Sequence, residues 1–178
     1  MESIVEQPCP LCSSDAGLKM IALTTEIPYF GEHTQITLVC DSCGWKQTDF
    51  IPAEGRVPGI WSIKIDDVSK MNTRIVRSSS GIIRIIDLDL EVEPGASASG
   101  YITNIEGVIN RFEDSIGIIL RQAETEQEFD TIEKCEELLN KLNNIKNGEM
   151  QVTIEIIDPR GHSQILHEDA VFRDISEG

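Results

Sequence analysis

Hydrophobic and polar positions alternate along several short stretches of the chain, which is the pattern of β-strands with one buried face. Near the N-terminus, strand-like stretches occupy residues 18–25, 35–39 and 45–51, and Pro28 and Gly31 indicate a turn between the first two. Further on, strand-like stretches occupy residues 61–65, 72–77, 82–86 and 88–93. The alternation is strict over residues 87–93, which predicts a strand with one buried and one solvated face. We expect the small residues of 95–100 to form an exposed loop.

The spacing of hydrophobic positions then becomes helical. Apolar residues from Ile105 to Leu120 share one face, and Thr103-Asn104-Ile105-Glu106 has the form of a capping box. These features predict a helix over residues 104–122. The stretch 125–128 repeats the capping pattern before a second apolar stripe, which contains Cys135 as a buried small side chain and ends at the C-cap signal of residues 147–148. The two helices should form an antiparallel hairpin over about residues 103–147.

Strand-like patterns return after the helices. They occupy residues 151–157, 162–167 and 172–175, and a turn over residues 158–161 follows the first of them. A helical hairpin inserted between groups of strands predicts a mostly β domain, either a β-sandwich or a rolled double sheet. We expect this domain to span residues 54–178.

Composition narrows the class of partner. The chain has 178 residues, with 31 acidic and 15 basic side chains and a formal net charge of -16. It lacks the excess of lysine and arginine with which proteins bind phosphates, so we expect no direct contact with nucleic acid. We find no stretch of about 20 apolar residues and no signal-peptide pattern, so we expect a soluble cytoplasmic protein without membrane contact. In the cytoplasm, spaced cysteines are first read as metal ligands.

Four cysteines form the strongest chemical signal. Cys9 and Cys12 make one Cys-x2-Cys pair, and Cys40 and Cys43 make a second that runs directly into Gly44. Each spacing lets two thiolates face one tetrahedral ion, and four thiolates leave no position open for a catalytic water. The pattern therefore predicts one structural zinc ion in a zinc ribbon over residues 1–53. A thioredoxin-like redox pair would require a strand-to-helix context that the sequence lacks.

The sequence offers few residues that could form a catalytic site. His162, His167 and Glu168 could in principle hold a metal in a rolled β-domain. The two histidines are five positions apart, so on one strand their side chains point to opposite faces. We therefore interpret them as surface residues, and we expect no catalysis and no small-molecule substrate.

The order of these features resembles the ZPR zinc-finger family, whose module joins a four-cysteine ribbon to a double-stranded β-helix with a helical hairpin. The resemblance covers nearly the whole chain. Beyond the cysteines, it rests on residues 74–78 before Gly81, on residues 100–109 and on residues 158–163. The chain departs from the family pattern at Thr48-Asp49 and at residues 85–88. Its single module is similar to the short archaeal form.

The resemblance implies a zinc-binding protein-interaction module that is a chaperone or binding partner of the translation elongation GTPase that carries aminoacyl-tRNA. A zinc-ribbon factor associated with nucleic acid and an uncharacterised enzyme of the β-domain remain as alternatives. Partner contacts are expected at Trp45, Arg77, Ser78, Thr103, Asn104, Glu106, Asp158 and Arg160. Helix capping by residues 103–107 and turn formation by residues 158–161 would explain several of these residues equally well.

Overall fold

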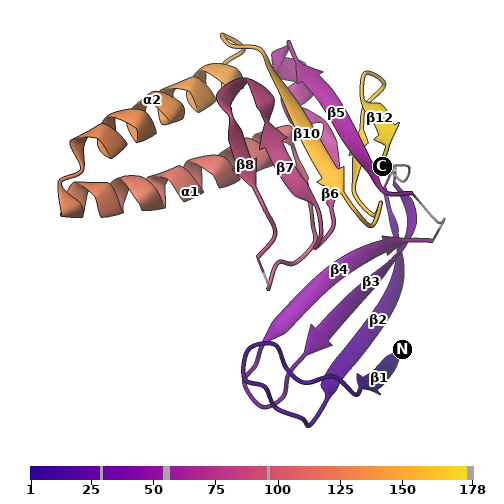
Figure 1. Cartoon of the computed structure of the whole chain (residues 1–178). Coiled ribbons are helices and arrows are strands. Elements are labelled where there is room, and N and C mark those ends of the chain that lie inside the picture. Colours follow the sequence, from indigo (N-terminus) through magenta and orange to yellow (C-terminus); the bar gives the residue numbers. More distant parts are fainter. Residues whose placement is uncertain (29, 54–56, 96, 176–178) are drawn as a thin grey trace.

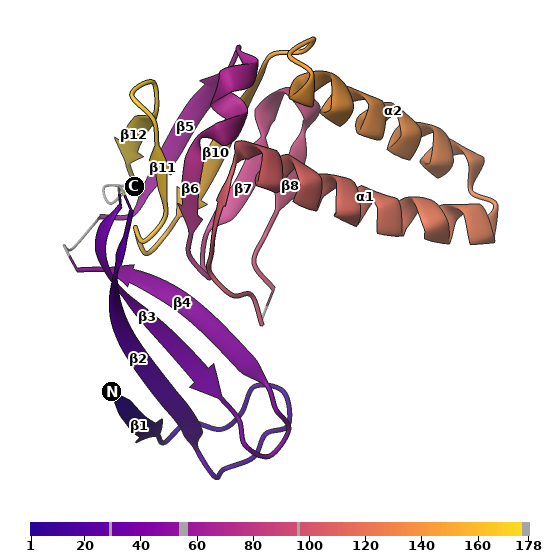
Figure 2. The same cartoon turned by 180° about the vertical axis from the view of Figure 1, so that it is seen from behind.

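The computed structural model describes residues 1–28, 30–53, 57–95 and 97–175. A slender antiparallel sheet carries the N-terminal cysteines, and a larger β body carries a pair of helices that project to one side (Figures 1 and 2). The boundary expected between residues 53 and 54 adjoins residues 54–56, which lie outside the described residues, and it stays a prediction. Within the described residues, neither helix is long and apolar enough to cross a membrane.

The N-terminal sheet has the strand order β1-β2-β3-β4. Its strands are β1 (Glu2–Val5), β2 (Leu18–Ile27), β3 (Gly31–Val39) and β4 (Lys46–Pro52). The three predicted strands are confirmed, the first two in longer form. β1 escaped prediction because it is a short edge strand whose side chains are mostly exposed, so burial imposes no alternation on it.

The larger body contains two sheets. One has the order β12-β5-β10-β7-β8 and the other has the order β11-β6-β9. The strands of the first are β12 (Val171–Asp174), β5 (Gly59–Ile65), β10 (Val152–Asp158), β7 (Ile82–Ile85) and β8 (Leu90–Val92). Those of the second are β11 (Gln164–Leu166), β6 (Arg74–Arg77) and β9 (Tyr101–Asn104). This arrangement confirms the rolled double sheet that was expected for the fold class.

The alternation of β10 organises the core of this body. Val152, Ile154 and Ile156 are all buried on one face, and Asp158 occupies the next inward position of the same strand. Ile154 pairs with Ile63 on β5 and with Ile85 on β7, so the apolar row of one strand continues across the sheet. The second sheet closes the same core with Ile75 and Ile165.

The helices α1 (Ile105–Glu126) and α2 (Phe129–Lys146) form the predicted antiparallel hairpin (Figure 1). Their apolar faces join the core of the body through Ile105, Val108, Ile109, Phe112, Ile116, Leu142 and Ile145. Cys135 is 5% exposed within this cluster, which confirms its interpretation as a small buried side chain. Gly148 has a positive φ of 76° directly after the C-cap Asn147, as the C-cap signal predicted.

Both predicted capping boxes are wrong in detail. Asn104, and not Thr103, caps α1, and its side chain accepts a 2.8 Å hydrogen bond from the Gly107 amide. The helix begins at Ile105, so the last residue of β9, Asn104, occupies the cap position, and Thr103 lies one residue further back in the strand, where it pairs with Ile75. At the second site α1 does not stop, and the Thr125 hydroxyl donates back to the Arg121 carbonyl within the helix.

The strand predicted over residues 88–93 is also interrupted. Ile86–Leu88 forms a 3-10 turn, and Asp89 takes a left-handed backbone with φ 52°, so β8 begins only at Leu90. The Asp87 carboxylate accepts a 2.6 Å hydrogen bond from the Thr153 amide, which holds the turn against β10. Since β8 is an edge strand, Leu90 is only partly buried against the core and Val92 is exposed, so the buried face that the alternation predicted is incomplete.

Candidate functional site

The four predicted zinc ligands converge at the end of the N-terminal sheet. The sulfur atoms of Cys9, Cys12, Cys40 and Cys43 all lie within 4.8 Å of one another. The Cys9–Cys43 and Cys12–Cys40 sulfur pairs are each 3.7 Å apart. Zinc–sulfur bonds of about 2.3 Å in a tetrahedron place sulfurs about 3.8 Å apart, so the site fits one zinc ion. These thiolates hold a structural zinc.

The turns around the two Cys-x2-Cys pairs have the same backbone conformation, with a left-handed residue directly after the second cysteine. Gly44 follows Cys43 with φ 75°, and Ser13 follows Cys12 with φ 55°. In each turn the amide of this residue donates to the carbonyl of the first cysteine of the pair, at 2.8 Å. A Cβ on Gly44 would meet no atom within 4 Å, so its left-handed backbone, and not lack of space, favours glycine there.

A small apolar cluster supports the metal site. Cys9 and Cys40 are buried with Leu18 and Trp45, and Leu38 packs against them. The Trp45 indole N–H donates a 3.1 Å hydrogen bond to the Ser97 hydroxyl of the larger body. Trp45 therefore connects the zinc centre to the segment between β8 and β9.

Residues 97–100 form one polar part of the contact between the two units. The Gln47 amide donates to the Ala98 carbonyl at 2.7 Å, and the Thr48 amide donates to the Ser99 hydroxyl at 3.1 Å. The Gly100 amide donates to the Thr48 carbonyl at 2.7 Å. The loop expected over residues 95–100 includes residue 96, which lies outside the described residues. Residues 95 and 97 are exposed as expected, but residues 98 and 99 are half-buried and Gly100 is buried against β4, so the expectation of an exposed loop is wrong for residues 98–100.

Asp49 forms a second polar part of this contact, beside an apolar cluster in which Ile27 and Phe30 of the ribbon pack with Val76 of β6. Its carboxylate accepts hydrogen bonds from the Ser79 amide at 2.8 Å and from the Ser79 hydroxyl at 2.5 Å. Arg160 approaches the same carboxylate at 4.0 Å with a largely exposed guanidinium, which makes that ion pair weak. We call the hydrogen bonds of residues 45–49 to residues 79 and 97–100 the interdomain joint.

Asp158 lies beneath the joint and is 1% exposed. Its carboxylate accepts hydrogen bonds from the hydroxyls of Ser78 at 2.7 Å, Ser80 at 2.8 Å and Ser163 at 2.6 Å. It also accepts from the backbone amides of Arg160, His162 and Ser163. Burial by itself raises the pKa of Asp158, but the hydrogen bonds, led by those of Ser163 and Ser78, outweigh it and hold the pKa below its usual value. The carboxylate is therefore ionised at neutral pH and orders the turn after β10.

Arg77 is buried beside this network. Its Nε donates to the Gly81 carbonyl at 2.8 Å, and a terminal nitrogen donates to the Ser99 carbonyl at 3.2 Å. Burial lowers the pKa of Arg77, and the neighbouring acidic groups, namely the Tyr101 phenol and the carboxylates of Asp49 and Asp158, partly offset this effect. Arg77 thus connects β6 to the same segment that holds the zinc-binding unit.

The residues expected to contact a partner fall into two groups, one buried and one accessible to solvent. Trp45, Arg77, Ser78 and Asp158 are buried and hydrogen-bonded within the protein, so in this arrangement they offer little surface to a partner. Thr103 and Asn104 are half-buried at the start of α1, and Glu106 and Arg160 are exposed. Partner contact by these four residues stays a prediction. His162 and His167, which were expected on the surface, are half-buried on either side of β11.

Several residues of the joint were not predicted. In the sequence, Asp49 is distinguished only by its departure from the family pattern. Ser79, Ser97 and Ser99 lie in short polar stretches that are typical of ordinary turns. No periodicity or spacing connects these residues, because their contacts span from 30 to 52 positions of the chain.

Comparison with known proteins places both units in one family. The ZPR1 zinc-finger domain model matches residues 3–56, and the ZPR1 jelly-roll domain model matches residues 69–174. A ZPR1-like protein of Methanocaldococcus jannaschii is 36% identical over 177 residues, which are 99% of this chain and 88% of that protein. A ZPR1-like protein of Pyrococcus horikoshii is 34% identical over 169 residues, 95% of this chain and 76% of that protein.

A eukaryotic relative carries a functional name. The zinc finger chaperone zpr1 of Schizosaccharomyces pombe is 28% identical over 165 residues, 90% of this chain but 34% of that longer protein. The match of both domains, in the observed order, agrees with the four-cysteine site and the rolled double sheet. This chain therefore belongs to the ZPR1 family of zinc-finger proteins.

Proposed function

We propose that the protein is a non-enzymatic chaperone or binding partner of the translation elongation GTPase that carries aminoacyl-tRNA. The name of the fission yeast relative supports a chaperone role. The choice of the elongation GTPase as the partner rests on the family resemblance. Protein binding needs an accessible apolar surface, and the hairpin of α1 and α2 supplies one.

The exposed apolar residues of the hairpin are the observation that carries this proposal. Ile118 and Ile119 on α1 are 60% and 51% exposed, and Phe129 at the start of α2 is 76% exposed. They lie in the part of the hairpin that projects beyond the β body (Figure 2). Large apolar side chains gathered on an accessible element indicate a surface for another protein.

Charge supplies a second line of support. With a net charge of -16, the protein complements a client whose nucleic-acid-binding face is basic. Complementary fields accelerate encounter between proteins and disfavour wrong partners. We therefore expect association with the GTPase to slow as ionic strength rises.

The test is an affinity pull-down from native extract with GTP or GDP added. We expect the intact protein to enrich the elongation GTPase. A variant with Cys40→Ser and Cys43→Ser, whose ribbon unfolds while the hairpin stays folded, shows by any loss of enrichment whether the ribbon adds to the contact. A variant with Ile118→Ser and Phe129→Ser should lose the enrichment while retaining zinc. The control Leu23→Ser removes an equally exposed apolar residue, 59% exposed, from the ribbon and should bind normally. Absence of the GTPase under both nucleotide conditions would refute the proposal.

A further inference from the structure

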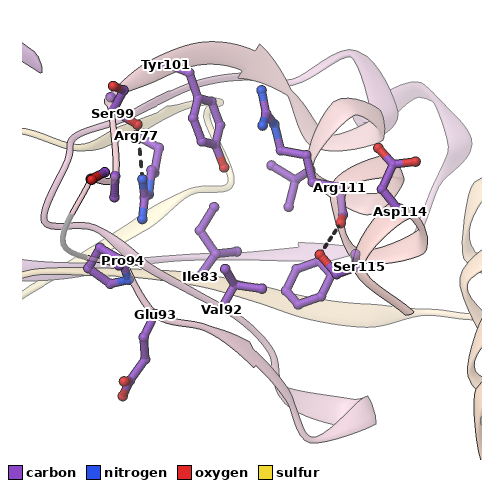
Figure 3. A pocket seen from close by; sticks show the side chains of 16 residues that line it. Arg77, Ile83, Val92, Glu93, Pro94, Ser99, Tyr101, Arg111, Asp114 and Ser115 are labelled. Carbon is purple, nitrogen blue, oxygen red and sulfur yellow. Dashed lines mark hydrogen bonds between the residues drawn. The ribbon is translucent and has the colours of Figure 1, made fainter. Parts of the chain in front are cut away.

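A cavity of about 560 Å³ lies between α1 and the segment that leads from β8 to β9 (Figure 3). Its size is within the range of small-ligand sites, about 300–1,000 Å³. Polar and apolar side chains line different parts of it. Its lining includes the polar side chains of Arg77, Tyr101 and Arg111 and the apolar side chains of Ile83, Val92 and Phe112.

Tyr101 stands between two arginines at the polar end of the cavity. Its ring centroid is 5.5 Å from the Arg77 guanidinium carbon and 4.0 Å from that of Arg111. Figure 3 shows its hydroxyl pointing into the cavity, and this hydroxyl bonds to none of the described residues. Burial raises the pKa of Tyr101, although both arginines oppose the effect, so the hydroxyl keeps its proton and can donate it in a hydrogen bond.

The two arginines have no carboxylate partner. Arg77 uses two of its five N–H groups on backbone carbonyls, and the others bond to no residue in the described part of the chain. Arg111 contacts the face of Tyr101 and forms no ion pair with a described carboxylate. In a chain with 31 acidic residues, two adjacent arginines without a direct ion pair are unusual. Asp49 and Asp158 act on the buried Arg77 guanidinium without touching it, so its charge is only partly compensated and the cavity favours an anion.

The remaining lining restricts the kind of anion. Ile83, Val92 and Phe112 form an apolar wall opposite the arginines. Glu93 and Asp114 lie at the rim, and their carboxylates point away from the centre in Figure 3. The two rim carboxylates offset part of the attraction of the arginines, and the cost of desolvating an ion rises steeply with its charge, so a singly charged carboxylate is favoured over a doubly charged phosphate. The apolar wall favours a ligand that also has an apolar part.

We propose that this cavity binds a carboxylate carried on an apolar body. The carboxylate accepts from the Tyr101 hydroxyl and from the Arg77 and Arg111 guanidiniums, and the apolar body packs against the opposite wall. Planar guanidinium forks match carboxylate geometry, which gives the site its preference. Such a ligand is either a small organic acid or an acidic residue next to an apolar one in a peptide.

The cavity also shares a wall with the interdomain joint. Ser99 and Gly100 line the cavity, and both bond to Thr48 of the ribbon. Arg77 contacts the Ser99 carbonyl directly. The backbone amides of Ser99 and Gly100 are therefore suitable reporters of an occupied cavity.

The test titrates 3-phenylpropionate into the zinc-loaded full chain and follows the amide NMR signals of Ser99, Gly100 and Tyr101. We expect saturable shifts at these signals. The neutral 3-phenylpropionamide lacks the charge and acetate lacks the apolar body, so each should bind at least about tenfold more weakly. A capped dipeptide of aspartate and phenylalanine distinguishes the source, because tighter binding than the free acid indicates a peptide ligand and weaker binding a small acid. Equal response to the acid and its amide would overturn the proposal.

Substitutions distinguish binding in the cavity from a general effect of the protein's net charge on ligand binding. Arg111→Gln removes an exposed cation of the cavity and should weaken binding about threefold or more. Arg121→Gln makes the same change on the same helix at an exposed position outside the cavity, and it should leave binding unchanged. Arg77→Lys should weaken binding about tenfold. If that buried variant fails to fold, Val92→Asp tests the wall instead, since a new carboxylate there should abolish binding. Equal behaviour of Arg111→Gln and Arg121→Gln would contradict the assignment.

Discussion

The Asp158 carboxylate lies 2.7 Å from the Ser78 hydroxyl, although 80 positions of the chain separate the two residues. This hydrogen bond joins the end of β10 to the segment after β6, and so connects the two sheets of the jelly roll. The same carboxylate orders the turn that places Arg160 beside Asp49 of the ribbon. One buried charge therefore supports both the β body and the surface on which the ribbon docks.

Replacing Asp158 should destabilise the protein strongly. In Asp158→Asn one acceptor oxygen becomes an NH2 group that faces hydroxyl and amide donors, and hydrogen bonds to a charged group are each worth about 1.5–3 kcal/mol. We expect the free energy of unfolding to fall by about 3 kcal/mol in urea titrations at pH 7. Asp114→Asn makes the same change at an exposed position of α1 and should alter stability by less than about 0.5 kcal/mol.

The Asp158 contribution should depend on pH in one direction. Its folded-state pKa lies below its ordinary value of 3.8, so its stabilisation is present above about pH 4 and disappears as pH falls through the folded-state pKa. The stability difference between the natural protein and Asp158→Asn should therefore be large at pH 7 and shrink below pH 4. Taking the difference cancels the acid release of zinc, which affects both proteins. A gap that stayed constant down to pH 2 would show that the network does not depend on ionisation.

Zinc removal should unfold the ribbon and spare the jelly roll. Without the ion no bond holds the four cysteine sulfurs within 4.8 Å of one another, and metal binding supplies about 10–16 kcal/mol to small ribbons. In hydrogen exchange after chelation, we expect the amides of β2, β3 and β4 to lose protection while those of β5 and β10 keep it. Trp45 fluorescence should shift to the red in a Trp61→Phe background. Loss of protection in both units would mean that they fold as a single unit.

The joint should weaken when Asp49 is removed. Asp49→Ala eliminates both hydrogen bonds from Ser79, a loss of about 1–3 kcal/mol. We expect faster hydrogen exchange at the Thr48 and Gly100 amides, which bond across the joint, with little change inside either unit. Glu26→Ala removes an exposed acidic residue of the same sheet and serves as the control. Similar exchange in both variants would show that Asp49 does not hold the ribbon in place.

The start of α1 can be assigned by a pair of variants. Asn104→Ala removes the observed cap and should lower stability by about 1 kcal/mol. Thr103→Val removes the hydroxyl that the sequence pattern favoured but keeps the shape of a β-strand residue, so its effect should be within about 0.5 kcal/mol. Thermal unfolding of the zinc-loaded proteins measures both. A larger loss for Thr103→Val would reverse the assignment.

The capping and strand errors have a common physical origin. Thr103 and Thr125 both match a local capping pattern, but tertiary pairing draws Thr103 into β9, and Thr125 lies inside a longer helix. The alternation of residues 87–93 predicted a continuous strand, but the contact of Asp87 with Thr153 bends the chain there. For Thr103 and Asp87 a bond to a distant segment outweighs a local preference of the order of 1 kcal/mol, whereas Thr125 stays within the helix and bonds to Arg121 four residues back.

Local periodicity and spacing determined the elements, the zinc ligands and the fold class. Each Cys-x2-Cys pair lies within a single turn of the chain, and the apolar stripes of α1, α2 and β10 follow the period of one helix or strand. These signals are local, so they can be recognised without knowledge of the fold. Only the tertiary structure decided that Asp158 and Arg77 are buried, that residues 97–100 dock on the ribbon, and that Arg111 and Tyr101 share a cavity with Arg77. These relations arise because folding brings distant segments together, and a polar side chain has the same sequence signature whether its partner is solvent or a distant residue.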